Sequence, residues 1–267
     1  MQESVFNIRK AKNSLKNIGN CGKINKKNIF YKPKHGGGIM KKIYIAVNIV
    51  MFVGLITFDI MYLMSGKLLE KALASGFFLT ECLFNVSICV KKRVKMRFPV
   101  FLLAAIALSF AADIALQIDM IIGMALFGTG HIFFFIAYCN VEKFAPKDAI
   151  PAAISIVGLL IIILFAPFLD FENTFMHTAV CVYAVIISFM TGKAISDIIR
   201  ARNAINAIIA AGSCLFWISD FALMFNIFGN ISAAGNICLF TYYPGQFILA
   251  LSPLVYAVRE NNEQTAS

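Results

Sequence analysis

Four acidic side chains interrupt strongly apolar segments of the sequence, and they are its best candidates for chemistry. They are Asp59, Glu81, Asp113 and Asp220. A carboxylate at the centre of a bilayer costs roughly 2.5–3.5 kcal/mol on insertion scales, so embedded acids tend to face a bundle interior or a wet cavity. Two such groups can divide general acid and general base roles, and one alone can hold a proton or a cation. The sequence therefore predicts a buried acidic site.

Helical spacing gathers other polar residues near these acids. Ser109 and Asp113 are four residues apart, as are Glu81 and Asn85, which places each pair on one helix face. At about 1.5 Å per residue the four acids fall at similar depths in the outer half of a membrane, as do two further polar residues. We expect one pocket to hold the acids together with His131 and Gln246.

The functional interpretation is stronger for some of these acids than for others. For Asp59 and Glu81, a structural role in joining neighbouring helices is an equal alternative. Asp113 and Asp220 lie among small residues, in segments that echo each other as Ser-Phe-Ala-Ala-Asp-Ile-Ala-Leu and Ser-Asp-Phe-Ala-Leu. A functional role is favoured for these two, while His131 is as readily a buried core residue as a proton relay.

Membrane helices must position these groups. The chain is 60% hydrophobic and 14% charged, against roughly 45–50% apolar and about 25% charged in soluble domains. Apolar runs near the ~20 residues needed to cross a bilayer recur along it. We predict an all-α polytopic membrane protein, with eight transmembrane helices in one bundle over residues 43–64, 72–90, 98–116, 120–139, 149–169, 175–195, 204–228 and 233–258.

The net charge of +10 is distributed unevenly between the two sides of the predicted membrane domain. Basic residues concentrate before the first helix and in the connection 91–97, whereas only Lys67 and Lys71 fall on the other side. By the positive-inside rule, both termini face the cytoplasm, and we expect an integral protein of a bacterial cell membrane. The basic residues then set the orientation of the helices in the membrane and attract anionic lipid head groups. No motif indicates nucleic-acid binding.

Three parts follow from this organisation: a basic tail over 1–42, the helical domain over 43–258, and a short cytoplasmic tail over 259–267. The first part is predicted to be disordered and attracted to the membrane surface. Alternatively, Gly36 to Gly38 represent a translated ribosome-binding sequence and Met40 is the true start.

Metal and cofactor chemistry finds little support in the sequence. The three histidines, His35, His131 and His177, are too few for a convincing zinc site, although a carboxylate-only metal site stays open. The seven cysteines form no Cys-x-x-Cys pair, and no Gly-x-Ser-x-Gly, His-Glu-x-x-His or Walker motif occurs. We expect no metal and no cofactor.

Four ordered blocks of sequence resemble the YhhN family of membrane proteins, which includes the lysoplasmalogenases. The blocks are Ser109 to Leu116 followed by Gly123, Phe127, Gly130-His131 and Tyr138; Val182-Tyr183-Ala184 with Met190; Leu215 to Asp220; and Thr241 to Gln246. The resemblance extends over roughly residues 43–258. Ala112 stands where the family has glycine and Lys71-Ala72 where it has Lys-Pro, but both candidate aspartates are kept.

The resemblance implies hydrolysis of the vinyl ether bond of a lysophospholipid, lysoplasmalogen, to a fatty aldehyde and a glycerophospho-alcohol. A neutral carboxyl group would protonate the β-carbon, and an ionised one would stabilise the resulting cation, as in glycosidases. Asp113 and Asp220 supply this pair, and the sequence leaves open which is the acid. The supporting or substrate-binding residues would be Asp59, Glu81, His131, Ser219, Tyr242, Tyr243 and Gln246.

Two other classes of function fit the same residues. In a small transporter or channel the buried acids would be proton or cation sites. In a lipid-binding scaffold or receptor they would serve assembly alone. Head group, oligomeric state and physiological role are not encoded in recognisable motifs.

Overall fold

The computed structural model describes residues 36–266, so residues 1–35 of the predicted basic tail (1–42), with His35, lie outside the described part. The chain divides into two units, 1–43 and 44–267, and the description that follows concerns the second. The described part is helical and contains no strand. Its elements are α2 (Gly36–Ser65), α3 (Leu68–Lys91), α4 (Arg97–Ala115), α5 (Met120–Val141), η1 (Pro146–Asp148), α6 (Ala149–Phe165), α7 (Thr174–Arg200), α8 (Ala204–Phe228) and α9 (Ser232–Ala266).

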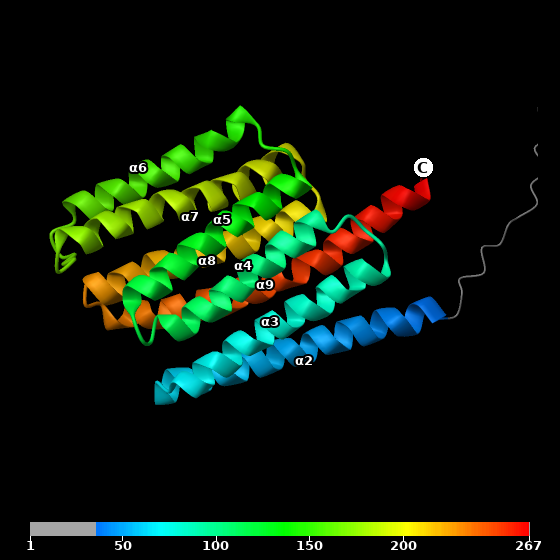
Figure 1. Cartoon of the computed structure of the whole chain (residues 1–267), viewed down its shortest axis with the longest axis horizontal. Helices are drawn as coiled ribbons and strands as arrows, with labels where there is room; N and C mark the ends of the chain where they lie inside the picture. The colour runs from blue at the N-terminus through cyan, green and yellow to red at the C-terminus, as the bar shows by residue number, and fades with distance from the viewer. Residues whose placement is uncertain (1–35, 267) are drawn as a thin grey trace, which may run out of the picture. The chain divides into compact units, whose positions relative to one another are not determined.

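Eight helices within residues 36–266 are long and apolar enough to cross a membrane. Consecutive helices alternate in direction, so their connections gather at two ends of the bundle (Figure 1). The connections 66–67, 116–119 and 229–231 lie at one end, and 92–96, 142–148 and 201–203 lie at the other. The prediction of an all-α polytopic bundle is confirmed.

Several helix ends differ from the predicted ones, and the local reason is clear for the ends of α6 and α9. α6 ends at Phe165 rather than at residue 169, because Ala166 precedes Pro167 and adopts an extended ψ of 112°. α9 continues past residue 258 to Ala266 through a polar segment in which Arg259 donates to Glu263 at 3.0 Å. Such an i,i+4 ion pair stabilises a helix end beyond the apolar run.

α9 lies at the centre of the helix packing and contacts α3, α4 and α8, while α4 pairs with α5 and α6 with α7 (Figure 1). The contact with α8 is especially close. A Cβ atom built on Gly212 of α8 would lie 2.7 Å from Cγ of Leu249, and one built on Gly245 of α9 would lie 3.2 Å from the Gly212 oxygen. Glycine at both positions lets the two backbones approach. About one turn further along, Phe216 and Tyr242 meet with their ring centroids 5.2 Å apart.

Candidate active site

A cavity of about 420 Å³, here called the acidic cavity, lies at the end of the bundle that carries the 66–67 and 116–119 connections. Both predicted catalytic acids line it, Asp113 near the end of α4 and Asp220 on α8. Its other polar wall residues are Tyr62, Lys71, Gln117, Ser219, Asn226, Asn236 and Tyr242. Helices distant in sequence therefore bring the two acids to one site.

Two hydroxyl groups and one ammonium group, from α3 and α9, contact the Asp113 carboxylate. Ser75 of α3 donates to its Oδ2 at 2.5 Å, and the Tyr242 hydroxyl of α9 donates to the same oxygen at 2.7 Å. The Lys71 ammonium lies 3.9 Å from Oδ1, and both side chains are nearly inaccessible. Two hydroxyl donors and one nearby cation stabilise the ionised form of this carboxyl group.

Asp220 has a different set of neighbours. The Tyr183 hydroxyl of α7 donates to its Oδ2, and His131 Nε2 of α5 lies 3.2 Å from that oxygen and 2.8 Å from the Tyr183 hydroxyl. The His131 ring is fully buried, and its Nδ1 has no hydrogen-bond partner among the described residues. These three side chains form a compact group that can pass a proton along hydrogen bonds.

An aromatic wall adjoins the surroundings of both acids. Phe127, Phe216 and Tyr242 meet edge to face, with ring centroids 5.2 to 6.0 Å apart, and Phe216 also contacts the His131 ring. Because Tyr242 bonds Asp113 and His131 faces Asp220, this wall joins the two halves of the site. Its apolar faces lower the local polarity and strengthen the remaining electrostatic contacts.

Several predicted supporting residues lie in or beside the acidic cavity. Ser219 lines it, with its hydroxyl 3.4 Å from the Cys238 sulfur. Asp59 is buried near Asp113. Tyr243 is fully buried, and its ring centroid lies 5.0 Å from that of Tyr242, whose hydroxyl donates to Asp113. Asp59 and Tyr243 therefore lie on the Asp113 side of the site.

The expectation that one pocket holds all these polar residues is not met, because Asp59, His131, Glu81 and Gln246 do not line the acidic cavity. Asp59 and His131 lie beside its two acids, but Glu81 and Gln246 lie apart from them. Each stands one helical turn from the hydrogen bond in which Asn85 of α3 donates to the Ala250 oxygen of α9 at 2.9 Å. Both side chains are buried between these helices, and their polar atoms have no partner among the described residues. They belong to a deeper polar layer.

Three residues that contact the two acids were not predicted from the sequence: Lys71, Ser75 and Tyr183. Lys71 was recognised only as a charge on the less basic side, and Tyr183 only as part of a family block. Ser75 precedes Phe78, Glu81 and Asn85 on the buried face of α3, so helical periodicity from Glu81 was the signal that could have found it. Within the described residues, no group of three or more His, Cys, Asp or Glu is placed to hold a metal ion.

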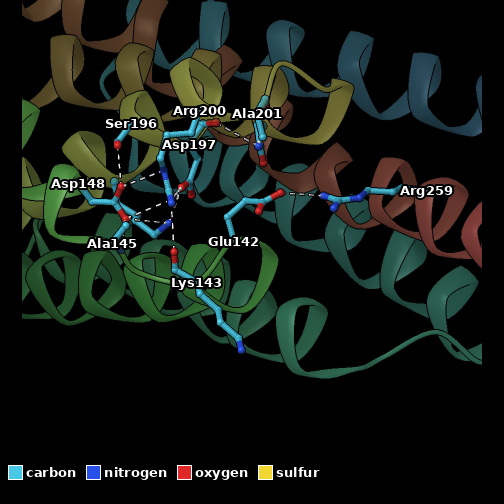
Figure 2. Close-up of polar contacts among 11 residues, drawn as sticks. Glu142, Lys143, Ala145, Asp148, Ser196, Asp197, Arg200, Ala201 and Arg259 are labelled. Carbon is cyan, nitrogen blue, oxygen red and sulfur yellow. Dashed lines mark hydrogen bonds and ion pairs between the residues drawn. The ribbon is translucent and has the colours of Figure 1, made fainter.

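A second polar cluster lies at the opposite end of the bundle, around η1 and the end of α7 (Figure 2). Lys193 is fully buried, with its ammonium 3.3 Å from Asp148 and hydrogen-bonded to Asp197. Arg200 also pairs with both aspartates, and Ser196 donates to Asp148 at 2.6 Å. Two cations balance two anions there, so every charge of the cluster is paired. The cluster therefore joins η1 to α7 and has a structural role.

Comparison with known proteins adds one positive result. Searches of curated proteins and of solved structures returned no match. A family model described as the YhhN family matches residues 72–253, which include both acids of the cavity and the aromatic wall. Because that match covers the greater part of the sequence, the chain belongs to the YhhN family.

Proposed function

We propose that this protein is an intramembrane hydrolase that cleaves the vinyl ether bond of lysoplasmalogen or a related single-chain lipid. The observation that carries the proposal is that Asp113 and Asp220 line one cavity in contrasting surroundings. Membership of a family that includes lysoplasmalogenases supports the reaction class. Hydrolysis of a vinyl ether needs one proton donor and one group that stabilises a cation, and the two carboxyl groups provide both.

The roles of the two acids follow from their neighbours. Asp113 accepts two hydroxyl hydrogen bonds beside Lys71, so it acts as the carboxylate that stabilises positive charge. Asp220, next to Tyr183 and His131, acts as the proton donor. Its proton adds to the β-carbon of the double bond, whose π electrons form the new C–H bond and leave an oxocarbenium ion.

Water then completes the reaction. Its oxygen bonds the oxocarbenium carbon and its proton returns to Asp220, which gives a hemiacetal. Protonation of the ether oxygen and loss of the hydroxyl proton break the C–O bond and release an aldehyde and an alcohol. One water is consumed and Asp220 ends protonated, so the cycle needs no further reactant.

The position of Asp220 also suits the substrate. It lines the polar acidic cavity and, at the same time, an apolar cavity of about 70 Å³ between α4, α5, α7 and α8. In a lysoplasmalogen the vinyl ether lies where the glycerol head joins the alkyl chain. A reacting group at a boundary between polar and apolar walls therefore matches the bond to be cleaved.

Aldehyde release from lysoplasmalogen by detergent-purified protein tests the proposal. Asp113→Asn and Asp220→Asn should each lower turnover by at least about 100-fold, the scale on which general acid–base groups contribute. Asp170→Asn, which alters an exposed carboxylate, is the matched control and should keep full activity. Unimpaired turnover in a folded Asp113→Asn or Asp220→Asn protein would remove that residue from the mechanism.

We further propose that both termini face the cytoplasm and that the acidic cavity opens toward the opposite face. Basic residues of the 91–97 segment lie at the far end of the bundle from this cavity, which supports the orientation under the positive-inside rule. In intact cells, a membrane-impermeant thiol reagent should label a Lys67→Cys variant but not a Lys95→Cys variant. The unsubstituted chain gives the background, and the reverse pattern would invert the topology.

Proton or cation translocation is the second candidate function, supported by the deeper layer of Glu81 and Gln246. Their buried polar atoms lack partners among the described residues, which is costly unless a proton, cation or water is bound. Reconstituted protein should then carry ion flux that Glu81→Gln removes. Flux without aldehyde release would favour transport over hydrolysis.

A further inference from the structure

The apolar cavity beside Asp220, here called the neck, adjoins two larger spaces. On one side it shares wall residues with the acidic cavity, namely Leu116, Phe127, Asp220, Leu223 and Ile227. On the other side it shares Met124 and Tyr183 with a surface groove of about 410 Å³ between α5 and α7. The acidic cavity, the neck and the α5–α7 groove therefore lie side by side in that order.

The α5–α7 groove lies between two helices that are long and apolar enough to cross a membrane. Its walls are almost entirely apolar, and Ile132, Phe175 and Val182 on its rim are well exposed. It lies on the lipid-crossing part of two helices, so a hydrocarbon chain can enter it from the side without meeting water. The neck, at about 70 Å³, is far smaller than the spaces it joins, which limits passage to one chain.

A second apolar route from Asp220 meets the acidic cavity at one residue only. A cavity of about 50 Å³ shares Asp220 with the acidic cavity, and it shares Leu159, Trp217 and Phe221 with a groove between α6, α7 and α8. Trp217 lies at this junction, where its ring stacks on Phe221 with centroids 5.4 Å apart and its Nε1 donates to Ser155 at 3.0 Å. The groove at the end of this second route serves as a control site for the α5–α7 groove.

We propose that the neck and the α5–α7 groove bind the single alkyl chain of the substrate, which enters or leaves sideways between α5 and α7. The identity of this occupant rests on the proposed function. The head group then lies in the acidic cavity, the chain passes Tyr183, and the bond between them lies beside Asp220. Gly128 sets the width of the groove, because a Cβ atom built there would lie 3.6 Å from the Tyr183 ring and 3.8 Å from Ile186.

Substitution at Gly128 tests the path through chain-length preference. Gly128→Leu should fill the groove where it meets the neck and lower kcat/KM for a long-chain lysoplasmalogen by about tenfold or more relative to a short-chain one. Gly158→Leu is the matched control, since Gly158 lines the groove between α6, α7 and α8 and a Cβ atom there meets nothing within 4 Å. An unchanged ratio in Gly128→Leu, or an equal change in Gly158→Leu, would overturn the path.

Photolabelling separates failure of the path from failure of the proposed function. A non-hydrolysable saturated ether lysolipid, with a diazirine near the end of its chain, should label α5 and α7 within 121–132 and 175–186 in the purified full-length protein. Excess unlabelled lysolipid should suppress this labelling, and excess two-chain phospholipid should not. Labelling without any aldehyde release would keep the path and refute the hydrolase. Labelling elsewhere, no labelling, or equal competition by two-chain lipid would refute the path.

Discussion

Lys71 and Asp113 face each other inside the bundle, with 3.9 Å between Nζ and Oδ1 and with side chains only 6% and 3% exposed. The pair joins the start of α3 to the end of α4 at the wall of the acidic cavity. A buried charge depends strongly on its counter-charge, because removing one partner leaves the other unpaired in a medium of low polarity.

Replacing Lys71 should therefore damage both stability and activity. Lys71→Met is expected to lower the free energy of unfolding by about 3 kcal/mol, the lower end for a broken buried pair given the 3.9 Å separation. Thermal denaturation in detergent measures this, and Lys71→Arg should recover part of the loss. Lys67→Met, which changes an exposed lysine in the 66–67 connection, serves as control. Equal melting temperatures for the two methionine variants would contradict the assignment of Lys71.

Tyr183→Phe removes the hydroxyl that donates to Asp220 and leaves the ring in place. Hydrogen bonds to charged or proton-transferring groups are worth about 1.5–3 kcal/mol, so we expect kcat for aldehyde release to fall about 10- to 100-fold. KM should change little, because the ring still lines the neck. Tyr138→Phe, which removes a buried hydroxyl 2.8 Å from Ser213 Oγ, should leave kcat unchanged. A similar loss in both variants would indicate a general packing defect.

The ionic cluster of Figure 2 should matter for stability and not for chemistry. Asp148→Asn leaves Lys193 and Arg200 short of one anion and should cost about 3–5 kcal/mol. Lys95→Gln breaks a longer ion pair, 3.9 Å to Glu260, in which Lys95 is 83% exposed, so stability should change by less than about 1 kcal/mol. Chemical denaturation in detergent compares the two. A selective loss of kcat in folded Asp148→Asn protein would show a catalytic link that we do not expect.

Gly212→Ala tests the close approach of α8 and α9. The added methyl group would overlap Leu249, and overpacking of this kind costs about 1–3 kcal/mol. Gly76→Ala adds the same group within α3, where nothing lies within 4 Å, and should not destabilise the fold. The difference between their melting temperatures is the measurement. If Gly212→Ala melts no lower than Gly76→Ala, the two glycines do not set the helix spacing.

The fold was predictable because a bilayer imposes length and polarity on each helix. Errors arose where local chemistry decides the end of a helix: Pro167 stops α6 early, and charged pairs extend α9 into polar sequence. The predicted depth of Glu81 in the membrane was also wrong, because the start of its helix was misplaced. α3 begins at Leu68 instead of residue 72, and four residues at about 1.5 Å each place Glu81 about 6 Å deeper than expected.

The site was predictable in part. Asp113 and Asp220 stand out because an acid in a membrane helix is expensive and so tends to be functional. Tyr183 and Ser75 do not stand out, since tyrosine and serine are common in such helices at little cost. Their importance comes from contacts with acids on other helices, 37 and 38 positions away in sequence. Periodicity within α3 can place Ser75 on the buried face, but it does not reveal which acid the hydroxyl contacts.

The two connections that contribute to the wall of the acidic cavity, 66–67 and 116–119, are too short to fold over its mouth. Among the described residues, these two connections therefore cannot close over the cavity and keep solvent out. Under the proposed function the bound lipid itself has to exclude water, so a poorly fitting lipid would leave bulk water beside Asp113 and Asp220. Discrimination among lipids and shielding of a reactive cation would then depend on the same quality of fit.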